Sequence, residues 1–201
     1  MSGSYDPDVR GALLVGSIPL HDAASVMTFA SDGLGRHLRR IPDGETGIRI
    51  NWTRWQEDVF SRATGLTSEL FDTGYLKRRK FRLRHRAGIN EIEFPPLGYA
   101  QAARESYAEF AGLKKRGRIL DHLKFQVCLP TPLACTVLYV FPDDQPEVEL
   151  AYEAAMLREV DDIVAAVPAA DLCIQWDTAV EFAVIEECVS AFPWRSDFGS
   201  R

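Results

Sequence analysis

The chain has 201 residues, of which 46% are hydrophobic and 26% charged, a composition typical of a soluble globular domain with a full core. Its formal net charge of −6 excludes general long-range attraction to nucleic acid or to an anionic membrane. No apolar run approaches the roughly 18 residues of a membrane span, and no signal-peptide pattern follows Met1. We therefore expect a cytoplasmic protein that binds neither nucleic acid nor membrane.

The N-terminal part predicts a first strand and helix. Residues 1–10 are polar and indicate a flexible N-terminus, and the apolar run 11–19 is typical of a strand buried on both faces. A helix is expected to begin after Asp22, a natural N-cap, and to close at Gly33. These segments form a first strand-helix unit.

A second unit follows, with a basic segment after it. Residues 37–42 predict a short strand that delivers the loop 43–47, and residues 52–63 have the spacing of an amphipathic helix. The strongly basic run 77–86 alternates in part, which indicates an exposed insertion or edge ribbon. A solvated ribbon is the simpler interpretation of this run, and a patch that attracts a polyanion is the alternative.

Two further units are predicted in the C-terminal half. A helix over 98–117 leads to a strand over 123–129 that ends before Pro130, because proline cannot donate to a central ladder. A helix over 146–167 precedes a strand over 171–177. Its expected buried face is Leu150, Ala154, Leu157, Val160, Val164 and Val167.

An amphipathic segment at 180–189 follows, and then a C-terminal tail at 191–201. Strands that alternate with helices predict a parallel sheet with right-handed crossovers. The expected fold class is therefore α/β, a partial (β/α)8 TIM-type barrel of about four βα units. We expect residues 11–190 to form one domain.

Polar residues follow the predicted strands, at the rim where ligands bind in barrels and open sheets alike. Glu45 and Asp177 are two carboxylates that would bind an ammonium group through charge-assisted hydrogen bonds. In the simpler alternative, Asp43 caps a turn and Asp177 caps the next helix. Ser17 and Thr131 complete the predicted rim.

The motifs Gly16-Ser17-Ile18-Pro19, Asp43-Gly44-Glu45 followed by Arg49, and Ile174-Gln175-Trp176-Asp177 resemble the catalytic barrel of cobalamin-independent methionine synthase. The order of these motifs matches over roughly residues 11–187, the first half of that barrel. The wider group of methionine synthase-like and uroporphyrinogen decarboxylase-like barrels fits more closely, because Trp176-Asp177-Thr178 replaces the family's Asp-Glu-Pro.

This resemblance implies substrate-binding residues. Glu45 and Asp177 would hold the amino group of homocysteine, Ser17 would lie near its carboxylate, and Arg49 would belong to the same rim. The expected function is that of a methyltransferase acting on a small thiol or amino-acid substrate, with no catalytic residue assigned. A methionine synthase-like S-methyltransferase is the expected enzyme class, if the chain is active.

The resemblance also implies zinc and a methyl-folate donor. The zinc ligands of that family are His, Cys and Glu with a second Cys, and they belong to the second half of the barrel. We therefore predict no metal site in this chain. Its cysteines have no CxxC spacing and are expected to be reduced core thiols; they are Cys128, Cys135, Cys173 and Cys188.

Two other functions are open at this stage. A truncated half-barrel without catalysis would bind or oligomerise, with a homodimer formed through exposed barrel edges. A uroporphyrinogen decarboxylase-like enzyme would need several arginines around substrate carboxylates, and only Arg49 lies near the predicted rim.

Overall fold

The computed structural model describes residues 11–51, 53–72, 77–84 and 91–186. The flexible N-terminus expected at 1–10 and the tail expected at 191–201 lie outside these residues. The chain divides into two compact units. The first combines the described part of Met1–Ile50 with Gln101–Cys128 and Ile163–Gln175, and the second combines the described parts of Asn51–Ala100, Leu129–Asp162 and Trp176–Arg201.

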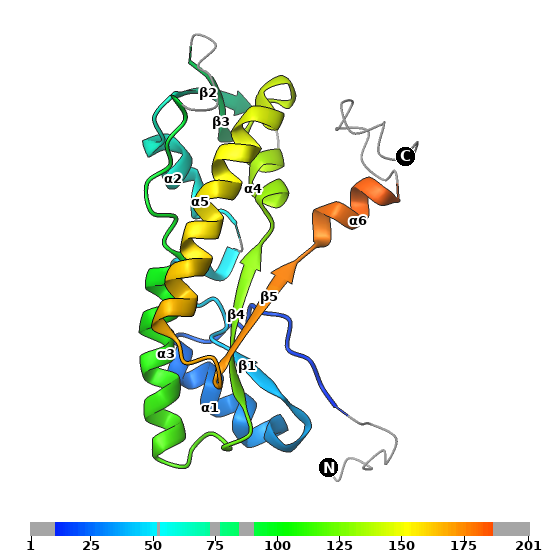
Figure 1. Ribbon diagram of the computed structural model, residues 1–201. Helices are drawn as coiled ribbons and strands as arrows, with labels where there is room; N and C mark the ends of the chain where they lie inside the picture. Colours follow the sequence, from blue (N-terminus) through cyan, green and yellow to red (C-terminus); the bar gives the residue numbers. More distant parts are fainter. Residues whose placement is uncertain (1–10, 52, 73–76, 85–90, 187–201) are drawn as a thin grey trace. The chain divides into compact units, whose positions relative to one another are not determined.

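Three parallel strands form the main sheet, in the order β1-β4-β5 (Figure 1). Their bounds are β1 Arg40–Pro42, β4 Lys124–Pro130 and β5 Leu172–Asp177. A second, two-stranded antiparallel sheet consists of β2 at Leu66–Asp72 and β3 at Lys77–Leu83. The predicted α/β class with a parallel sheet is thus confirmed, and the described strands do not close into a barrel. A homodimer through barrel edges stays a prediction.

Six α-helices occur in the described ranges: α1 Ala23–Leu34, α2 Gln56–Arg62, α3 Tyr99–Lys115, α4 Pro132–Tyr139, α5 Gln145–Ala166 and α6 Ala179–Ile185. The sequence did not predict α4, which begins directly after β4 with Thr131 as its N-cap. The segment expected at 180–189 is helical as far as Ile185, and residues 187–189 lie outside the described part. No helix in these ranges has the length and apolar character that a bilayer crossing requires.

The first predicted strand, at 11–19, is wrong. The segment makes two bonds to the backbone around β1, from Ala12 N to His37 O at 2.8 Å and from Ile18 N to Gly44 O at 2.9 Å. Between them, the carbonyls of Leu14 and Val15 accept hydrogen bonds from side chains of β4 and β5. These side chains take the place of a ladder partner, so no strand forms. Leu13 and Val15 are also 56% and 66% exposed, whereas burial on both faces was expected.

The helix expected after Asp22 is confirmed, because the Asp22 carboxylate accepts from Ser25 N at 2.7 Å. It continues through Gly33 to Leu34. The strand expected at 37–42 is shorter, since residues 35–37 form a 3-10 turn before β1. The helix expected at 52–63 begins only at Gln56.

Helix α3 ends as the sequence predicted. Lys114 and Lys115 lie in its last turn. Gly117 N donates to Lys114 O at 2.9 Å, and Arg118 N donates to Leu113 O at 2.9 Å. These two bonds satisfy carbonyls of the last turn in the pattern of a Schellman motif. The chain is thereby turned toward β4.

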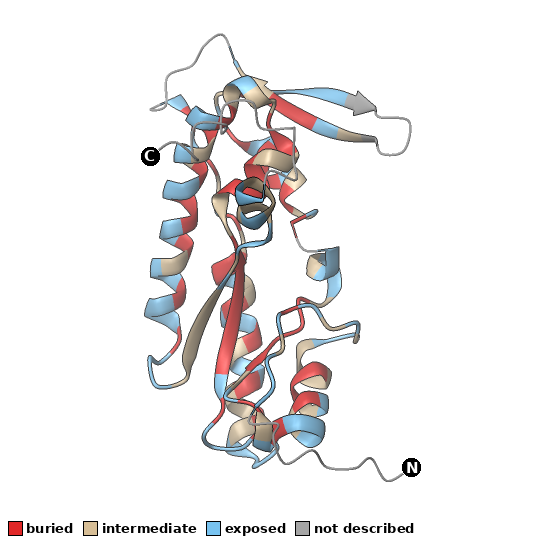
Figure 2. Cartoon of the chain, turned by 90° about the vertical axis from the view of Figure 1, so that its right-hand side faces the viewer, coloured by how far each residue is buried: buried red, intermediate tan, exposed pale blue. Residues whose placement is uncertain are grey.

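The two faces of β4 have different roles in the first unit. Phe125 packs on Tyr107 and Phe110 of α3, with ring centroids 5.9 and 5.6 Å apart. Side chains alternate along a strand, so Gln126 and Cys128 point to the opposite face. Nearly all of β4 is buried (Figure 2). One face is therefore the aromatic core, and the other is available to polar groups.

The helix expected at 146–167 is confirmed as α5, but most of its expected buried face is wrong. Leu150, Leu157 and Val164 are each more than half exposed, whereas Val167, just after the helix, is buried as expected. The residues that α5 buries are Gln145, Val148, Tyr152, Ala155, Met156, Glu159 and Ile163. Because this stripe includes a tyrosine and a glutamate, a search for aliphatic residues selected the wrong side of the helix.

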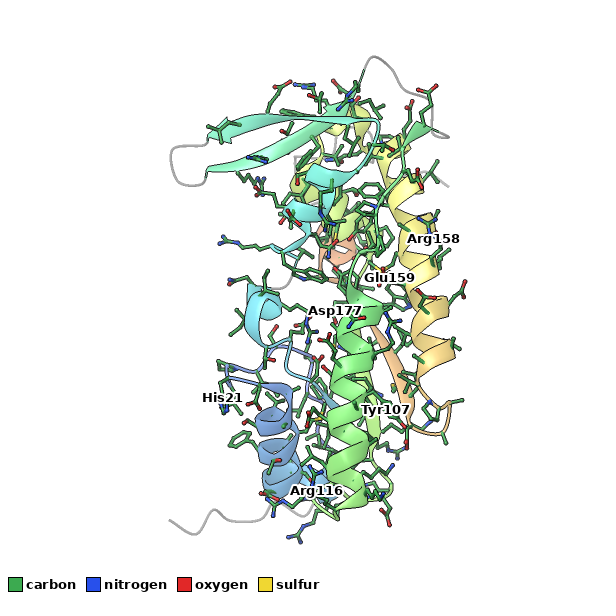
Figure 3. All side chains as sticks on the ribbon, turned by 90° about the vertical axis from the view of Figure 1, so that its left-hand side faces the viewer. His21, Tyr107, Arg116, Arg158, Glu159 and Asp177 are labelled. Atoms are coloured by element: carbon green, nitrogen blue, oxygen red, sulfur yellow. The ribbon has the colours of Figure 1, made fainter. Side chains whose placement is uncertain are left out.

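The buried carboxylate of Glu159 accepts hydrogen bonds from backbone N–H groups at the start of α3 (Figure 3). Its Oε1 accepts from Leu97 N at 2.6 Å, and its Oε2 accepts from Ala100 N at 2.6 Å. The first N–H groups of a helix have no partner within the helix, and a negative charge there is favoured by the helix dipole.

Phe60 belongs to the core of the same unit. Its ring packs on the rings of Phe81, Phe94, Tyr139 and Tyr152.

The basic ribbon predicted at 77–86 is confirmed in its described part, because β2 and β3 form a two-stranded hairpin. It is not wholly solvated. Lys80 and Phe81 are buried, and Lys80 lies 5.6 Å from the centroid of the Phe141 ring. The Arg82 guanidinium lies 3.7 Å from the same centroid.

An ion pair joins α3 to the start of β5. Lys114 Nζ lies 2.8 Å from Asp171 Oδ1, and Tyr107 OH donates to Asp171 Oδ2 at 2.9 Å. The hydrogen bond from Lys114 lowers the pKa of Asp171 below its usual value, and the bond from Tyr107 acts in the same direction. A depressed carboxyl pKa stabilises the fold above the pKa of the unfolded chain, near 3.8, and that stability is lost as the pH falls through the folded-state value.

We predict that Asp171→Asn lowers the free energy of unfolding at pH 7 by up to about 1 kcal/mol. Between pH 5 and pH 2, the variant should lose less stability than the wild type, because it lacks the titrating carboxyl. Urea unfolding followed by circular dichroism across this range measures both effects. If the two proteins lost equal free energy of unfolding between pH 5 and pH 2, the assignment of this pH dependence to Asp171 would be contradicted.

Candidate functional site

The loop after β1 holds one residue in an unusual backbone conformation. Glu45 has φ = 48°, and among the described residues it is the one non-glycine residue with positive φ. Its N–H donates to Asp43 Oδ1 at 2.9 Å. Such a conformation costs about 1–3 kcal/mol and persists where the surroundings fix it, often at a functional site. The strain therefore draws attention to Glu45.

Asp43 fixes this loop. Its Oδ2 accepts from Arg49 Nη2 at 2.7 Å and from Ser106 Oγ on α3 at 2.8 Å. Both Asp43 and its neighbour Glu45 are buried, at 6% exposure. Because all these bonds stabilise the loop, the structure supports the interpretation that Asp43 caps a turn. Arg49 neutralises this carboxylate.

Gly44 allows the loop to lie against α1. A Cβ atom there would come within 2.6 Å of Val26 Cγ2, and the residue has φ = 79°. Glycine alone adopts this conformation without steric cost. The close contact of the loop with α1 thus depends on the absence of a side chain.

Ser17 and Glu45 are brought together, as the sequence predicted for one rim. Ser17 Oγ donates to Glu45 Oε2 at 2.5 Å, and Ser17 is exposed while Glu45 is buried. A Cβ atom on Gly16 would lie 3.1 Å from Glu45 Oε2 and 3.4 Å from Cys128 Sγ. Glycine at position 16 therefore lets the serine approach the carboxylate.

Three side chains hold the segment that carries Ser17. Gln126 Nε2 donates to Leu14 O at 2.9 Å and to Val15 O at 3.1 Å. Cys128 Sγ and Gln175 Nε2 also donate to Val15 O, at 3.1 and 2.5 Å. Sequence reasoning missed Gln126. Its signal was a glutamine within an otherwise apolar strand, since a buried amide must find hydrogen-bond partners.

Asp177 is the last residue of β5 and belongs to the second unit, where it is half-buried. The expectation that it faces one cleft with Glu45 stays a prediction.

The sequence analysis also missed Glu181, which lies in the first turn of α6, four residues after Asp177. Thr131 donates to Glu181 Oε1. Glu181 Oε2 is buried and has no partner among the described residues.

The metal implied by the resemblance does not fit the described residues. They contain no group of three or more His, Cys, Asp and Glu side chains that could hold a metal ion. Cys128 and Cys135 are buried thiols and Cys173 is a half-buried thiol, while Cys188 lies outside the described residues. His21 lies 2.8 Å from Asp22 on the surface.

Comparison of the chain with models of known protein families, with curated proteins and with solved structures found no match.

We predict that Gly44→Ala destabilises the fold by about 2–3 kcal/mol, through unfavourable φ and the contact with Val26. Gly47→Ala is the matched control. Gly47 also has positive φ, 67°, but nothing lies within 4 Å of an added Cβ. The control should lose about 1 kcal/mol. If thermal or urea unfolding showed the same loss of stability for both variants, the contact of Gly44 with α1 would make no separate contribution to the stability of the fold.

Proposed function

We propose that this chain binds a small amino-acid or thiol substrate by its ammonium group, on the Glu45 carboxylate beside Ser17. The observation that supports this most directly is the pairing of a buried, conformationally strained Glu45 with an exposed Ser17 hydroxyl at 2.5 Å. A fixed carboxylate with an adjacent hydroxyl offers acceptors to the N–H groups of a cation.

Local charge favours the same class of ligand. Arg49 pairs with Asp43 and compensates that carboxylate. Residues 43–49 carry two carboxylates, Asp43 and Glu45, against one arginine, so the loop has an excess of acidic groups that favours a cationic ligand. We assign Arg49 to positioning the loop, and we keep Ser17 and Glu45 as substrate-binding residues.

The proposed reaction class is methyl transfer to the substrate thiol, in a methionine synthase-like protein whose three parallel strands are part of a (β/α)8-type barrel. What supports it is the order of the sequence motifs together with the parallel sheet and the Ser17–Glu45 contact. Zinc and methyl-folate are the corresponding cofactors of that family. The residues described here support the binding step of this proposal.

The test is calorimetric titration of the full chain with homocysteine and with 4-mercaptobutyrate, which has the thiol and carboxylate but no amino group. We expect homocysteine to bind more tightly. Glu45→Gln should weaken homocysteine binding about 10- to 100-fold, because a hydrogen bond to a charged group contributes about 1.5–3 kcal/mol. The same change should leave 4-mercaptobutyrate binding within about twofold of the wild type.

Glu109→Gln is the matched control, since Glu109 is an exposed glutamate on α3 of the same unit. It removes the same charge from a side chain outside the loop and should bind homocysteine as the wild type does. Equal affinity for the two ligands, or equal weakening by both substitutions, would overturn the proposal. A melting temperature for each variant shows whether it is folded.

A further inference from the structure

A second polar site lies in the first unit, at the amino ends of β1 and β4. It is a cleft of about 540 Å³ whose lining includes Arg36, His37, Arg39, Arg40 and His122. The loop that carries Glu45 follows the carboxyl end of β1. The cleft is therefore at the other end of that strand and is separate from the proposed amine site.

The lining of this cleft is strongly basic. Five of its nine residues are arginine or histidine, and none is acidic. Arg36 and Arg39 are exposed, and neither makes an ion pair within the part of the chain that the structure describes. A chain with net charge −6 thus gathers three arginines around one concave surface. Clefts lined by charge of one sign concentrate the field and attract a counter-ion.

Arg40 is oriented before any ligand binds. Its Nε donates to Gln126 Oε1 at 2.8 Å, and the amide nitrogen of Gln126 is held by the carbonyls of Leu14 and Val15. The Gln126 amide therefore cannot rotate without breaking these bonds. No hydrogen bond from the terminal guanidinium nitrogens of Arg40 occurs within the described ranges, and an arginine whose Nε is already held loses less entropy when it binds a ligand.

His122 adds a further polar group. Its Nε2 lies 3.2 Å from Leu38 O. A carbonyl oxygen only accepts hydrogen bonds, so Nε2 carries the proton in this contact, and Nδ1 is the nitrogen left for other partners. The backbone bond from Ala12 N to His37 O joins two of the segments that line the cleft.

We propose that this cleft binds the phosphate group of a small molecule. Guanidinium groups match phosphate oxygens in geometry and charge, and three of them suit a multiply charged anion. A volume of about 540 Å³ is that of a small-molecule site. The overall negative charge of the chain opposes an extended polyanion such as nucleic acid. This site does not depend on the amine-binding function proposed above.

The experiment is calorimetric titration of the full chain with inorganic pyrophosphate at low ionic strength. We expect saturable binding with one site per chain. The double variant Arg36→Gln/Arg39→Gln should weaken pyrophosphate binding at least about tenfold, since each substitution removes charge-assisted hydrogen bonds to the ligand. Both arginines are exposed, so the variant should melt as the wild type does.

Arg104→Gln is the matched control, because Arg104 is an exposed arginine on α3 of the same unit and does not line the cleft. It should bind pyrophosphate within about twofold of the wild type. Glu45→Gln should also leave this binding intact, which separates the two sites. No saturable binding, or equal weakening by Arg104→Gln, would overturn the proposal. Binding that tightens steadily with the length of an oligonucleotide would likewise overturn it, in favour of a nucleic-acid surface.

Discussion

The amide of Gln126 is the interaction on which both candidate sites depend. This side chain is fully buried in the middle of the parallel sheet, on the face that does not pack on α3. Its nitrogen binds the carbonyls of Leu14 and Val15, and its oxygen accepts from Arg40. A buried amide that lost these partners would cost about 1–3 kcal/mol for each unsatisfied group. The Gln126 amide therefore fixes both the backbone at residues 14–15 and the side chain of Arg40.

The two ends of β1 are organised differently around this anchor. At the carboxyl end, the bonds of Asp43 to Arg49 and Ser106 hold a strained loop that presents Glu45 to Ser17. At the amino end, an arginine held by an amide faces a cleft without acidic residues. One end thus offers acceptors for a cation, and the other offers donors for an anion.

The sequence predicted the elements whose signals are local. The cap of α1 at Asp22 and the end of α3 before Gly117 depend on adjacent residues, whereas β4 includes Pro130, before which it was expected to stop. The failure at 11–19 has a long-range cause, since Gln126 and Gln175 occupy the carbonyls that a strand partner would use. No local pattern shows such bonds across more than 100 residues. The short helix α4 was missed because its apolar residues follow β4 without a polar loop between them.

Candidate functional residues could likewise be predicted where their signal was local, and not where it depended on long-range contacts. Glu45 was found because it follows the end of a strand, and Ser17 was assigned to the end of a strand that does not form, yet the structure brings the two together. The role of Ser106 in holding Asp43 was not predictable, because the two residues are 63 positions apart. The basic cleft escaped notice because its arginines are not contiguous with His122, whereas the contiguous basic run at 77–86 drew attention instead.

Amide hydrogen exchange of Gln126→Met, compared with the wild type, tests most directly whether this one side chain holds the segment. The account predicts faster exchange at Ala12 N and Ile18 N, whose bonds keep the segment beside β1, with unchanged exchange in the middle of α3. Gln101→Met, an exposed change on α3, should alter neither Ala12 nor Ile18. Unchanged protection of Ala12 and Ile18 in a folded Gln126→Met protein would contradict the central claim.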